Sequence, residues 1–384
     1  MHLVFRRAAA GLALAATLLA AQAQSSPVTL LHSFSMAEGF TSAGNLLLAP
    51  DGALYGTLEW GGDGVFGTDN NGDGTLFRVG ADGGVAVVHQ FNHADGGWPV
   101  GSMALAPDGL IWGSTQRGGD FNQGTIFTFE PATQVLTTRH HFTGTDGAYP
   151  TSLTRGADGL LYGVTQFGGA AGIGTVFRID PATGALATLH EFTDRAKGAY
   201  PLGGVVLASD GAVWGSTTRG GIGGGHKGVL FRIGPFGHYR VVHAFHHLGQ
   251  EGCDVHGDLM QASNGLIYGT ASRCGAYPNQ GMGTVFALSL AGEFQVVHQF
   301  ELQVCGDPEA SVTEAPDGTL YGTAARAGHG DKGCVWKITP DGGWELVRRF
   351  HPVDPAARPG TAAVLRDGKL YTTSTADVFS IAPF

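Results

Sequence analysis

A unit that recurs seven times along the chain constrains its fold more than any other feature. Each unit contains an Asp-Gly or Asn-Gly turn, with a Tyr or Trp four residues after the first turn residue. Successive turns lie 50 to 57 residues apart and begin at Asp51, Asp108, Asp158, Asp210, Asn264, Asp317 and Asp367. A fixed period of this length indicates small modules that bury their apolar faces against neighbouring copies.

Two further sequence elements recur with the turn. The first has the form Gly-Thr-apolar-Phe, and its aromatic residues are Phe77, Phe127, Phe177, Phe231, Phe286, Trp336 and, in a degenerate copy, Phe379. The second is His-x-Phe, which ends at Phe34, Phe91, Phe142, Phe192, Phe245 and Phe300, with Arg348-Arg349-Phe350 as a variant. Each unit therefore holds four short apolar segments separated by Gly-rich connections.

These segments are predicted to be four antiparallel strands, A to D. Asp-Gly between strands A and B is a strong hairpin signal, because a two-residue turn with positive φ favours these residues. Four strands repeated seven times predict an all-β fold, a seven-bladed β-propeller. Residues 28–34 supply only a D strand, and the last unit lacks one. We therefore expect the N-terminal strand to complete the last blade, which removes an open sheet edge.

The first residues have the pattern of a secretory signal peptide. Arg6 and Arg7 precede an uncharged apolar run, residues 8–20, and Ala21-Gln22-Ala23 offers a cleavage site. The run is shorter than the roughly 20 residues that span a bilayer. We expect cleavage near Ala23, which leaves residues 24–384 as one propeller domain. The expected product is secreted or periplasmic, monomeric and without a membrane span.

Composition excludes several classes of protein. The net charge of −10 argues against a nucleic-acid partner, for which a basic surface is expected. Aromatic residues make up 10% of the chain, so it has enough apolar surface to fold. Its four cysteines are Cys253, Cys274, Cys305 and Cys334, and an even number in an exported protein predicts two disulfides. Three pairings are possible, and the sequence does not choose among them.

The recurring pattern Asp-Gly-x-Leu-Tyr-Gly-Thr, Gly-Thr-Val-Phe and Leu-His-x-Phe resembles a known tandem repeat. It is similar to the GloVer repeat of extracellular proteins described as choice-of-anchor, over residues 28–384. The resemblance implies an exported propeller and no particular activity. The chain ends at Ile381-Ala-Pro-Phe384 without a sorting tail, so we expect a soluble product.

The B–C and D–A loops lie on one face of a propeller and carry nearly all the non-repeating sequence, so a site is predicted there. Four arginines follow strand B at equivalent positions, Arg117, Arg219, Arg273 and Arg326, where other blades have Trp60 and Phe167. Such an arc can hold carboxylate or sulfate groups by bidentate bonds. The alternative is that each arginine pairs with a nearby acid such as Asp120, Glu309 or Asp331. We predict an extracellular ligand, a carbohydrate and in particular an anionic polysaccharide.

Several other side chains are candidates for this face. His256 and Asp258 precede strand A of the fifth blade and are predicted to lie near the central channel. With Arg219 and Arg273, His256 could instead serve a polysaccharide lyase, as the base beside arginines that stabilise a uronate. A structural or adhesive role is a second alternative. Trp98, Tyr149 and Tyr200 could stack on sugars, although packing between blades is favoured. The repeated histidines of the His-x-Phe elements are expected to bond to neighbouring backbone groups.

One loop has a cation-binding pattern. Asp69, Asn71 and Asp73 place oxygen atoms at alternate positions before Gly74, as at the start of a calcium loop. The match is incomplete, because position twelve is Gly80 where such loops have Glu. We therefore predict a structural Ca²⁺ at these three residues, with an ordinary Asn- and Gly-rich turn as the alternative.

Overall fold

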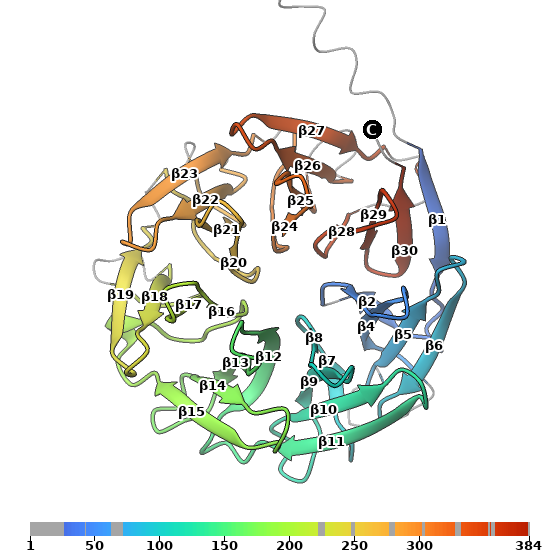
Figure 1. Ribbon diagram of the computed structural model, residues 1–384, viewed down its shortest axis with the longest axis horizontal. Helices are drawn as coiled ribbons and strands as arrows, with labels where there is room; N and C mark the ends of the chain where they lie inside the picture. Colours follow the sequence, from blue (N-terminus) through green and yellow to red (C-terminus); the bar gives the residue numbers. More distant parts are fainter. Residues whose placement is uncertain are drawn as a thin grey trace, which may run out of the picture.

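The computed structural model is a closed ring of seven antiparallel sheets around a central channel (Figure 1). It describes residues 27–42, 44–62, 72–221, 227–246, 250–275, 281–301, 304–326, 332–351, 354 and 358–382. Within these ranges the only helix is a 3₁₀ turn, η2 (Arg195–Lys197). The predicted all-β, seven-bladed propeller is confirmed. None of the helices in the described ranges has the length and hydropathy to cross a membrane.

The first three blades are formed by residues 40–191. Blade 1 comprises β2 (Phe40–Ser42), β3 (Leu47–Leu48), β4 (Leu54–Trp60), β5 (Thr75–Val79) and β6 (Val85–Gln90). Blade 2 comprises β7 (Gly97–Pro99), β8 (Ala104–Leu105), β9 (Ile111–Arg117), β10 (Thr125–Glu130) and β11 (Val135–His141). Blade 3 comprises β12 (Ala148–Arg155), β13 (Leu161–Phe167), β14 (Thr175–Ile179) and β15 (Leu186–Glu191). Strand A is split into two pieces in blades 1 and 2.

Blades 4 to 6 follow the same order from the channel outward. Blade 4 comprises β16 (Val206–Leu207), β17 (Val213–Ser216), β18 (Val229–Ile233) and β19 (Tyr239–Ala244). Blade 5 comprises β20 (Met260–Gln261), β21 (Ile267–Ala271), β22 (Thr284–Leu288) and β23 (Phe294–Gln299). Blade 6 comprises β24 (Thr313–Glu314), β25 (Leu320–Ala324), β26 (Cys334–Ile338) and β27 (Trp344–Arg349).

Blade 7 joins the two ends of the described chain. Its strands are β28 (Val364–Arg366), β29 (Lys369–Thr373), β30 (Asp377–Ile381) and, outermost, β1 (Val28–Ser33). Strand β1 pairs antiparallel with β30, from Val28 opposite Ile381 to Ser33 opposite Asp377 (Figure 1). The predicted closure by the N-terminal strand is confirmed. Strand β1 covers the outer edge of strand C in blade 7, so this edge is not left unpaired.

Local chemistry explains why the turn recurs. The side chain of Asp51 accepts a hydrogen bond from the amide of Ala53 at 3.0 Å, and Gly52 takes a φ of +76° with open space around it. Five other blades repeat this bond with Asp108, Asp158, Asp210, Asn264 and Asp317. Asp or Asn at the first position and Gly at the second are therefore the residues that such a turn requires.

The core consists of aromatic residues packed between and within blades. Phe77 of strand C is fully buried against Gly56 of strand B, where an added Cβ would lie 2.3 Å from the Phe77 ring. The same close approach recurs for Gly113 with Phe127 and for Gly163 with Phe177. The Gly after the repeated Tyr or Trp therefore makes room for the repeated Phe, which links these two sequence elements.

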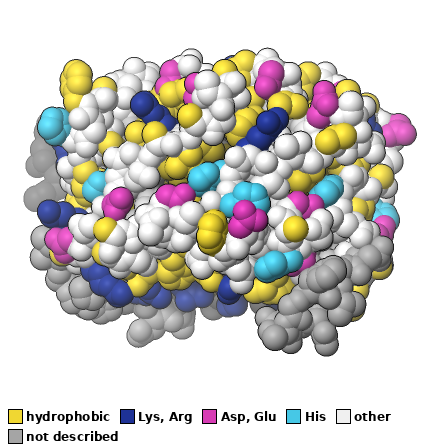
Figure 2. Space-filling view, turned by 90° about the horizontal axis from the view of Figure 1, so that it is seen from below, with side chains coloured by type: hydrophobic (Ala, Val, Ile, Leu, Met, Phe, Trp, Pro, Cys, Tyr) yellow, Lys and Arg dark blue, Asp and Glu magenta, His cyan; other side chains and the backbone are white. Residues whose placement is uncertain are grey.

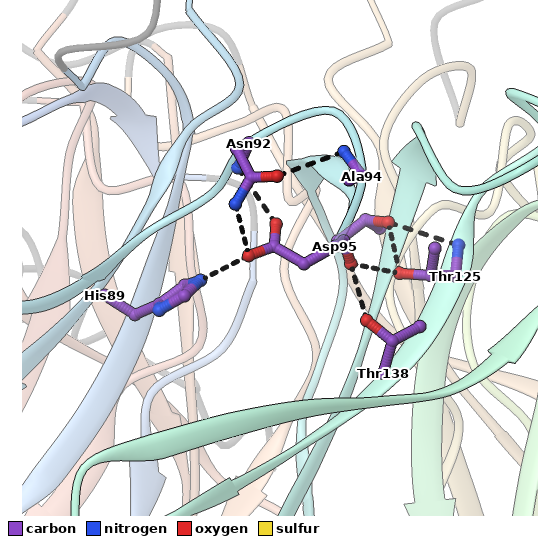
Figure 3. A network of polar contacts seen from close by, with 7 residues as sticks. His89, Asn92, Ala94, Asp95, Thr125 and Thr138 are labelled. Carbon is purple, nitrogen blue, oxygen red and sulfur yellow. Dashed lines mark hydrogen bonds and ion pairs between the residues drawn. The ribbon is translucent and has the colours of Figure 1, made fainter.

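The repeated histidines lie along the outer wall of the ring, where Figure 2 shows them beside acidic side chains. His89 contacts the carboxylate of Asp95 at 3.1 Å, and Asn92 bonds the same carboxylate (Figure 3). The main-chain carbonyl of Asp95 accepts from Thr125 and Thr138 of the next blade. The expectation of backbone partners was wrong for His32, His89 and His140, because an acid six residues later reaches each ring and fixes the D–A loop.

Equivalent contacts occur elsewhere on the wall in two forms. His32 contacts Glu38 at 2.9 Å and His140 contacts Asp146 at 2.8 Å. In the other form the imidazole stacks on an aromatic ring of the next blade: His190 on Tyr239, His243 on Phe294 and His298 on Trp344, with ring centroids 4.0 to 4.1 Å apart. Both forms connect one blade to the next.

Two disulfides are present, as predicted, and they join Cys253 to Cys274 and Cys305 to Cys334. The described part of the chain has no free cysteine. Cys253 and Cys305 belong to D–A loops, whereas Cys274 follows strand B of blade 5 and Cys334 begins strand C of blade 6. Both disulfides therefore fix loops on the face for which a site was predicted.

Candidate functional site

A polar cavity of about 350 Å³ lies at the mouth of the central channel. Its lining comes from D–A loops, from the starts of A strands and from the ends of B strands, and includes Glu59, Gln116, Ser152, His256, Asp258 and Glu309. These segments all belong to the face that carries the B–C and D–A loops. The cavity therefore lies on the face where the sequence predicted a site.

Asp258 forms the floor of this cavity by joining several blades. One carboxylate oxygen accepts from the hydroxyl of Ser102 and from the amide of Asn45, the latter at 3.4 Å. The other oxygen accepts from the backbone N–H of Gly204, and the backbone N–H of Asp258 donates to Ser311 at 2.8 Å. These bonds connect blade 5 with blades 1, 2, 4 and 6. Asp258, a predicted ligand residue, thus uses both carboxylate oxygens to tie the channel wall together.

A first ring of residues surrounds the cavity, and each of these residues has an unusual backbone conformation. One residue in each D–A loop has a positive φ between 55° and 63°: Thr41, Trp98, Tyr149, Tyr200, Asp254, Asp307 and Arg358. This geometry lets the backbone N–H bond to the preceding blade, as from Trp98 to the carbonyl of Asp73 at 2.8 Å. Positive φ is uncommon for residues other than Gly, and its recurrence here marks a constrained rim.

A second ring comes from the ends of the B strands. Sheet register pairs Trp60 with Phe40, Arg117 with Gly97 and Phe167 with Ala148. The corresponding bridges pair Arg219 with Ala199, Arg273 with Cys253 and Arg326 with Gly306. In each blade the partner directly precedes the positive-φ residue of the first ring. The four predicted arginines therefore occupy equivalent places around one rim, and the side view shows basic side chains gathered along one edge of the ring (Figure 2).

The rim of blades 1 to 4 forms an aromatic arc, which comprises Trp60, Trp98, Arg117, Tyr149, Phe167 and Tyr200. The rings of Trp60 and Trp98 lie 4.4 Å apart. Arg117 is inserted between Trp98 and Tyr149, with its guanidinium carbon 4.8 and 4.6 Å from the two ring centroids. Phe167 continues the series, 5.3 Å from both Tyr149 and Tyr200. These cation–π and edge-to-face geometries hold the rings as one continuous surface.

The rim of blades 4 to 6 forms a charged arc, which comprises Arg219, Asp254, Arg273, Asp307 and Arg326. Arg326 binds the carboxylate of Asp307 at 3.2 Å, and Lys227 approaches Asp254 at 3.5 Å. Burial raises the pKa of Asp307, and its Oδ1 atom is buried without a hydrogen-bond partner in the described structure. Among the described residues, neither Arg219 nor Arg273 has an acidic partner within 4 Å.

His256 lies between the charged arc and the cavity floor. It is partly buried, and burial holds its pKa below the ordinary value, with Asp254 opposing this shift and Arg273 adding to it. Arg219 also lowers the pKa, so both arginines lie close enough to influence the imidazole. Burial therefore favours the neutral form of the His256 imidazole.

The structure thus brings three predicted residues together, His256, Arg219 and Arg273. It separates Arg117 and Trp60 from them, because these two belong to the aromatic arc. Of the acids named as alternative arginine partners, Asp120 instead lies 3.7 Å from His141, Glu309 lines the cavity, and Asp331 lies outside the described residues.

Sequence reasoning missed three acids of the site, Asp254, Asp307 and Glu59. A usable signal existed for Asp307, which directly precedes Pro308 just as Trp98, Tyr149 and Tyr200 precede prolines.

The predicted calcium loop is described only at its end. Asp69 and Asn71 lie outside the described residues, whereas Asp73 is buried. The backbone N–H of His93 donates to the Asp73 carboxylate, while Oδ2 has no partner in the described structure. Burial is the main cause of the raised pKa of Asp73. A bound cation would satisfy such an oxygen, and the prediction of Ca²⁺ remains a proposal.

By its fold and its rim, the protein is a tandem-repeat propeller with a polar cavity at the mouth of its channel. The chain belongs to the Gloeobacter/Verrucomicrobia repeat family, whose model matches residues 16–226 and 194–380. Comparison with proteins of curated function gives no significant match.

Solved structures with the same fold have low sequence identity to this chain. A catalytically inactive variant of virginiamycin B lyase from Staphylococcus aureus, with quinupristin, has a TM-score of 0.64 and 14% identity over 93% of this chain and 99% of its own. The extracellular domain of a protein described as a hybrid two-component system of B. thetaiotaomicron has a TM-score of 0.62 and 13% identity. That alignment covers 93% of this chain and 42% of the other. At these identities the likeness shows the fold alone.

Proposed function

We propose that this protein binds an extracellular carbohydrate across the mouth of its channel. The observation that carries the proposal is the aromatic arc, which lies beside a cavity lined by hydroxyl, amide and carboxylate groups. Aromatic faces bury the apolar faces of sugar rings, and a few placed polar groups orient the hydroxyls. Because Trp98, Tyr149 and Tyr200 come from successive blades, several sugar units can lie along the arc in sequence.

The charged arc supplies the second part of the proposal, which is that the carbohydrate is anionic. Arg219 and Arg273 are exposed and have no ion-pair partner among the described residues. A guanidinium binds carboxylate or sulfate with two parallel hydrogen bonds and thereby recognises a planar acidic group. An acidic polysaccharide would place its rings on the aromatic arc and its acidic groups on these arginines.

Titration calorimetry with oligogalacturonate tests this function. Arg219→Ala with Arg273→Ala should weaken binding about tenfold or more, because two charge-assisted contacts are lost. Tyr200→Ala should weaken binding of any oligosaccharide that stacks on the aromatic arc. Phe236→Ala is the matched control, since Phe236 is 90% exposed in the turn between β18 and β19 on the opposite face. Undiminished affinity in both site variants would exclude the proposed surface.

A second candidate function is elimination on a uronate polymer, and the neutral state of His256 favours it. A base that removes the proton next to the carboxylate must be unprotonated, and neighbouring arginines stabilise the charge that develops. His256, Arg219 and Arg273 are residues of the types that this reaction requires. New ultraviolet absorbance from unsaturated ends, absent in His256→Gln, would establish this reaction, and no absorbance across a panel of uronate polymers would eliminate it.

We also propose that the protein is exported, with cleavage near Ala23. Two disulfides are typical of proteins from oxidising compartments, and the apolar N-terminal run has the features of a signal peptide. Both points are tested by mass spectrometry of the protein recovered from the periplasm or the medium, which identifies its N-terminal residue. A mature chain that begins at Gln24 is expected.

A further inference from the structure

The joint between blades 3 and 4 departs from other joints of the outer wall. In four D–A loops, the residue before a Gly of positive φ is an acid whose main-chain carbonyl accepts a hydroxyl from the next blade: Glu38, Asp95, Asp146 and Glu251. Each of these carboxylates contacts the repeated histidine that precedes it, at 2.8 to 3.2 Å. Lys197 holds the same position in the joint of blades 3 and 4, because Gly198 follows it with a φ of +128° and its carbonyl accepts the Tyr239 hydroxyl. A positive charge therefore replaces a negative one at this joint.

His190, the repeated histidine of this joint, consequently lacks an acidic partner. Neither of its ring nitrogens has a hydrogen-bond partner in the described structure, and neither is sealed from solvent. The ring is held against Tyr239 of β19, with centroids 4.0 Å apart and planes 5° apart. Burial lowers the pKa of His190 to about 4, with Lys197 adding to this shift and Glu191 opposing it. The ring is therefore neutral at neutral pH and presents one N–H donor without an acceptor.

A cavity of about 590 Å³ lies beside this histidine, between the outermost strands of blades 3 and 4. Figure 1 shows these strands, β15 and β19, as neighbours on the outside of the ring. Apolar parts of the lining come from Ala196, Tyr239, Val241 and Ala244. Small-molecule sites have volumes of about 300–1,000 Å³ and combine mostly apolar walls with a few polar groups. The cavity has the size and the lining of such a site.

Two other charged residues of the lining are engaged or directed elsewhere. The side chain of Asp194 accepts the backbone N–H of Ala196 at 2.9 Å and so caps η2. The guanidinium of Arg240 extends toward blade 5, where one of its nitrogens lies 4.0 Å from the Cβ position of Gly292. Lys197 is exposed and has no ion-pair partner among the described residues. His190 and Lys197 are thus the groups of the lining that an anionic ligand would meet.

We propose that this cavity binds a small carboxylic acid with an apolar body, whose carboxylate takes the place of the missing acidic side chain. The carboxylate accepts the N–H of His190 and pairs with Lys197, while the apolar body packs against Tyr239 and Val241. The other joints show that a carboxylate suits the edge of the repeated histidine, and hydrogen bonds to a charged group are about twice as strong as neutral ones. The site lies on the outer wall and does not depend on the carbohydrate function.

Titration calorimetry of the intact protein with 2-naphthoate and 2-naphthalenemethanol tests this proposal, because the two probes share an apolar body and differ in charge. The acid should bind about tenfold or more tightly than the alcohol, the value of one charge-assisted contact. Lys197→Glu restores the acid of the other joints and should weaken 2-naphthoate by at least about tenfold, since its carboxylate occupies His190 and repels the ligand. His190→Phe keeps a ring on Tyr239 and should reduce the preference for the acid. Lys369→Glu, at an exposed position of β29 in blade 7, makes the same change of charge and is the control.

The outcomes decide for or against the site. Equal affinity for the two probes, or no binding of either to the wild type, overturns the proposal. Undiminished affinity for 2-naphthoate in Lys197→Glu, or an equal loss in Lys369→Glu, also overturns it. A full preference for the acid in His190→Phe overturns the role of the imidazole. Circular dichroism melting of each variant shows whether a loss of binding reflects a loss of fold.

Discussion

The aromatic arc and the charged arc occupy equivalent positions in different blades of the same ring. In both, a positive-φ residue of the D–A loop stands beside the residue that ends strand B. Trp98 and Arg117 hold these positions in blade 2, and Asp254 and Arg273 hold them in blade 5. Blades 1 to 3 occupy the right and lower parts of Figure 1, and blades 5 to 7 the upper part. One backbone framework therefore supports two surfaces with different chemistry.

The arcs also differ in what holds them in place. In the aromatic arc, side chains stabilise one another by tilted and edge-to-face ring contacts, and Arg117 is fixed between two rings. In the charged arc, arginines alternate with aspartates. Exposed ion pairs contribute little to stability, because water screens them. Both disulfides anchor loops of the charged arc. We infer that covalent links replace the ring contacts that this half of the rim lacks.

Removing the Cys253–Cys274 disulfide should give the largest effect on stability. The two residues are 21 apart in sequence, and the chain-entropy model gives about 3 kcal/mol for a loop of this size. Cys253→Ala with Cys274→Ala should therefore lower the free energy of unfolding by about 3 kcal/mol, measured by urea denaturation under oxidising conditions. An unchanged denaturation midpoint would refute the idea that this disulfide supports the charged arc.

Substitutions of equivalent arginines should lower the free energy of unfolding by different amounts in the two arcs, and both amounts should be smaller than for the disulfide. Arg117→Ala removes two cation–π contacts, which together are worth about 1–2 kcal/mol of stability at a half-buried site. Arg219→Ala removes an exposed side chain, and its effect should stay within about 0.5 kcal/mol. Urea denaturation of the two variants side by side provides the measurement. Equal losses would mean that the arcs do not differ in how they are held.

The sequence predicted the blades because the chemistry of each turn is local. Asp51 and Gly52 are sufficient to specify their hairpin, and Gly56 with Phe77 specifies a close contact between strands B and C. Closure followed from counting strands, since the first unit had one strand and the last lacked one. None of these inferences required knowledge of contacts between distant residues.

The site was predicted only in part, because its character depends on neighbours that the sequence does not reveal. The repeat placed Arg117 and Arg273 at equivalent positions, yet one packs between rings and the other lies exposed beside His256. The role of Asp254 follows from a positive-φ geometry that is visible only in three dimensions, whereas Asp307 had a signal in the proline that follows it. The disulfide pairing likewise required the relative placement of loops.

Acid should weaken the two forms of histidine contact on the wall in different pH ranges. Burial lowers the pKa of His298, stacked on Trp344, to about 4 from 6.5. Between these values the unfolded chain binds more protons, so this contribution to stability is present at neutral pH and is lost as pH falls from 6.5 to about 4. Hydrogen bonds from Thr143 and His140 lower the pKa of Asp146 despite its burial, so that contribution is lost only as pH falls below its ordinary value of 3.8.

Thermal unfolding as a function of pH measures this difference. His298→Phe keeps a ring on Trp344 and removes the titrating group, so its melting temperature should fall less than that of the wild type between pH 6.5 and 4. Asp146→Asn, which alters the other form of contact, should retain the wild-type slope in this window. Parallel curves for His298→Phe and the wild type would show that His298 does not titrate with a lowered pKa.

Removal of calcium should have the smallest effect and should act on the aromatic arc alone. The carbonyl of Asp73 accepts the backbone N–H of Trp98 at 2.8 Å, so an ion at Asp69, Asn71 and Asp73 would hold the end of the loop that positions this ring. A ligand that binds only the folded state stabilises it by mass action. We expect chelation to lower the melting temperature by a few degrees and to change the fluorescence of Trp60 and Trp98, whose ring centroids lie 4.4 Å apart.

Asp73→Asn separates this effect from a general action of the chelator. The variant keeps the backbone bond to Trp98 but has one formal charge fewer for a cation, so chelation should no longer change its melting temperature or fluorescence. If wild type and variant respond equally to chelation, any ion lies elsewhere. If neither responds, no calcium ion stabilises the fold at Asp73.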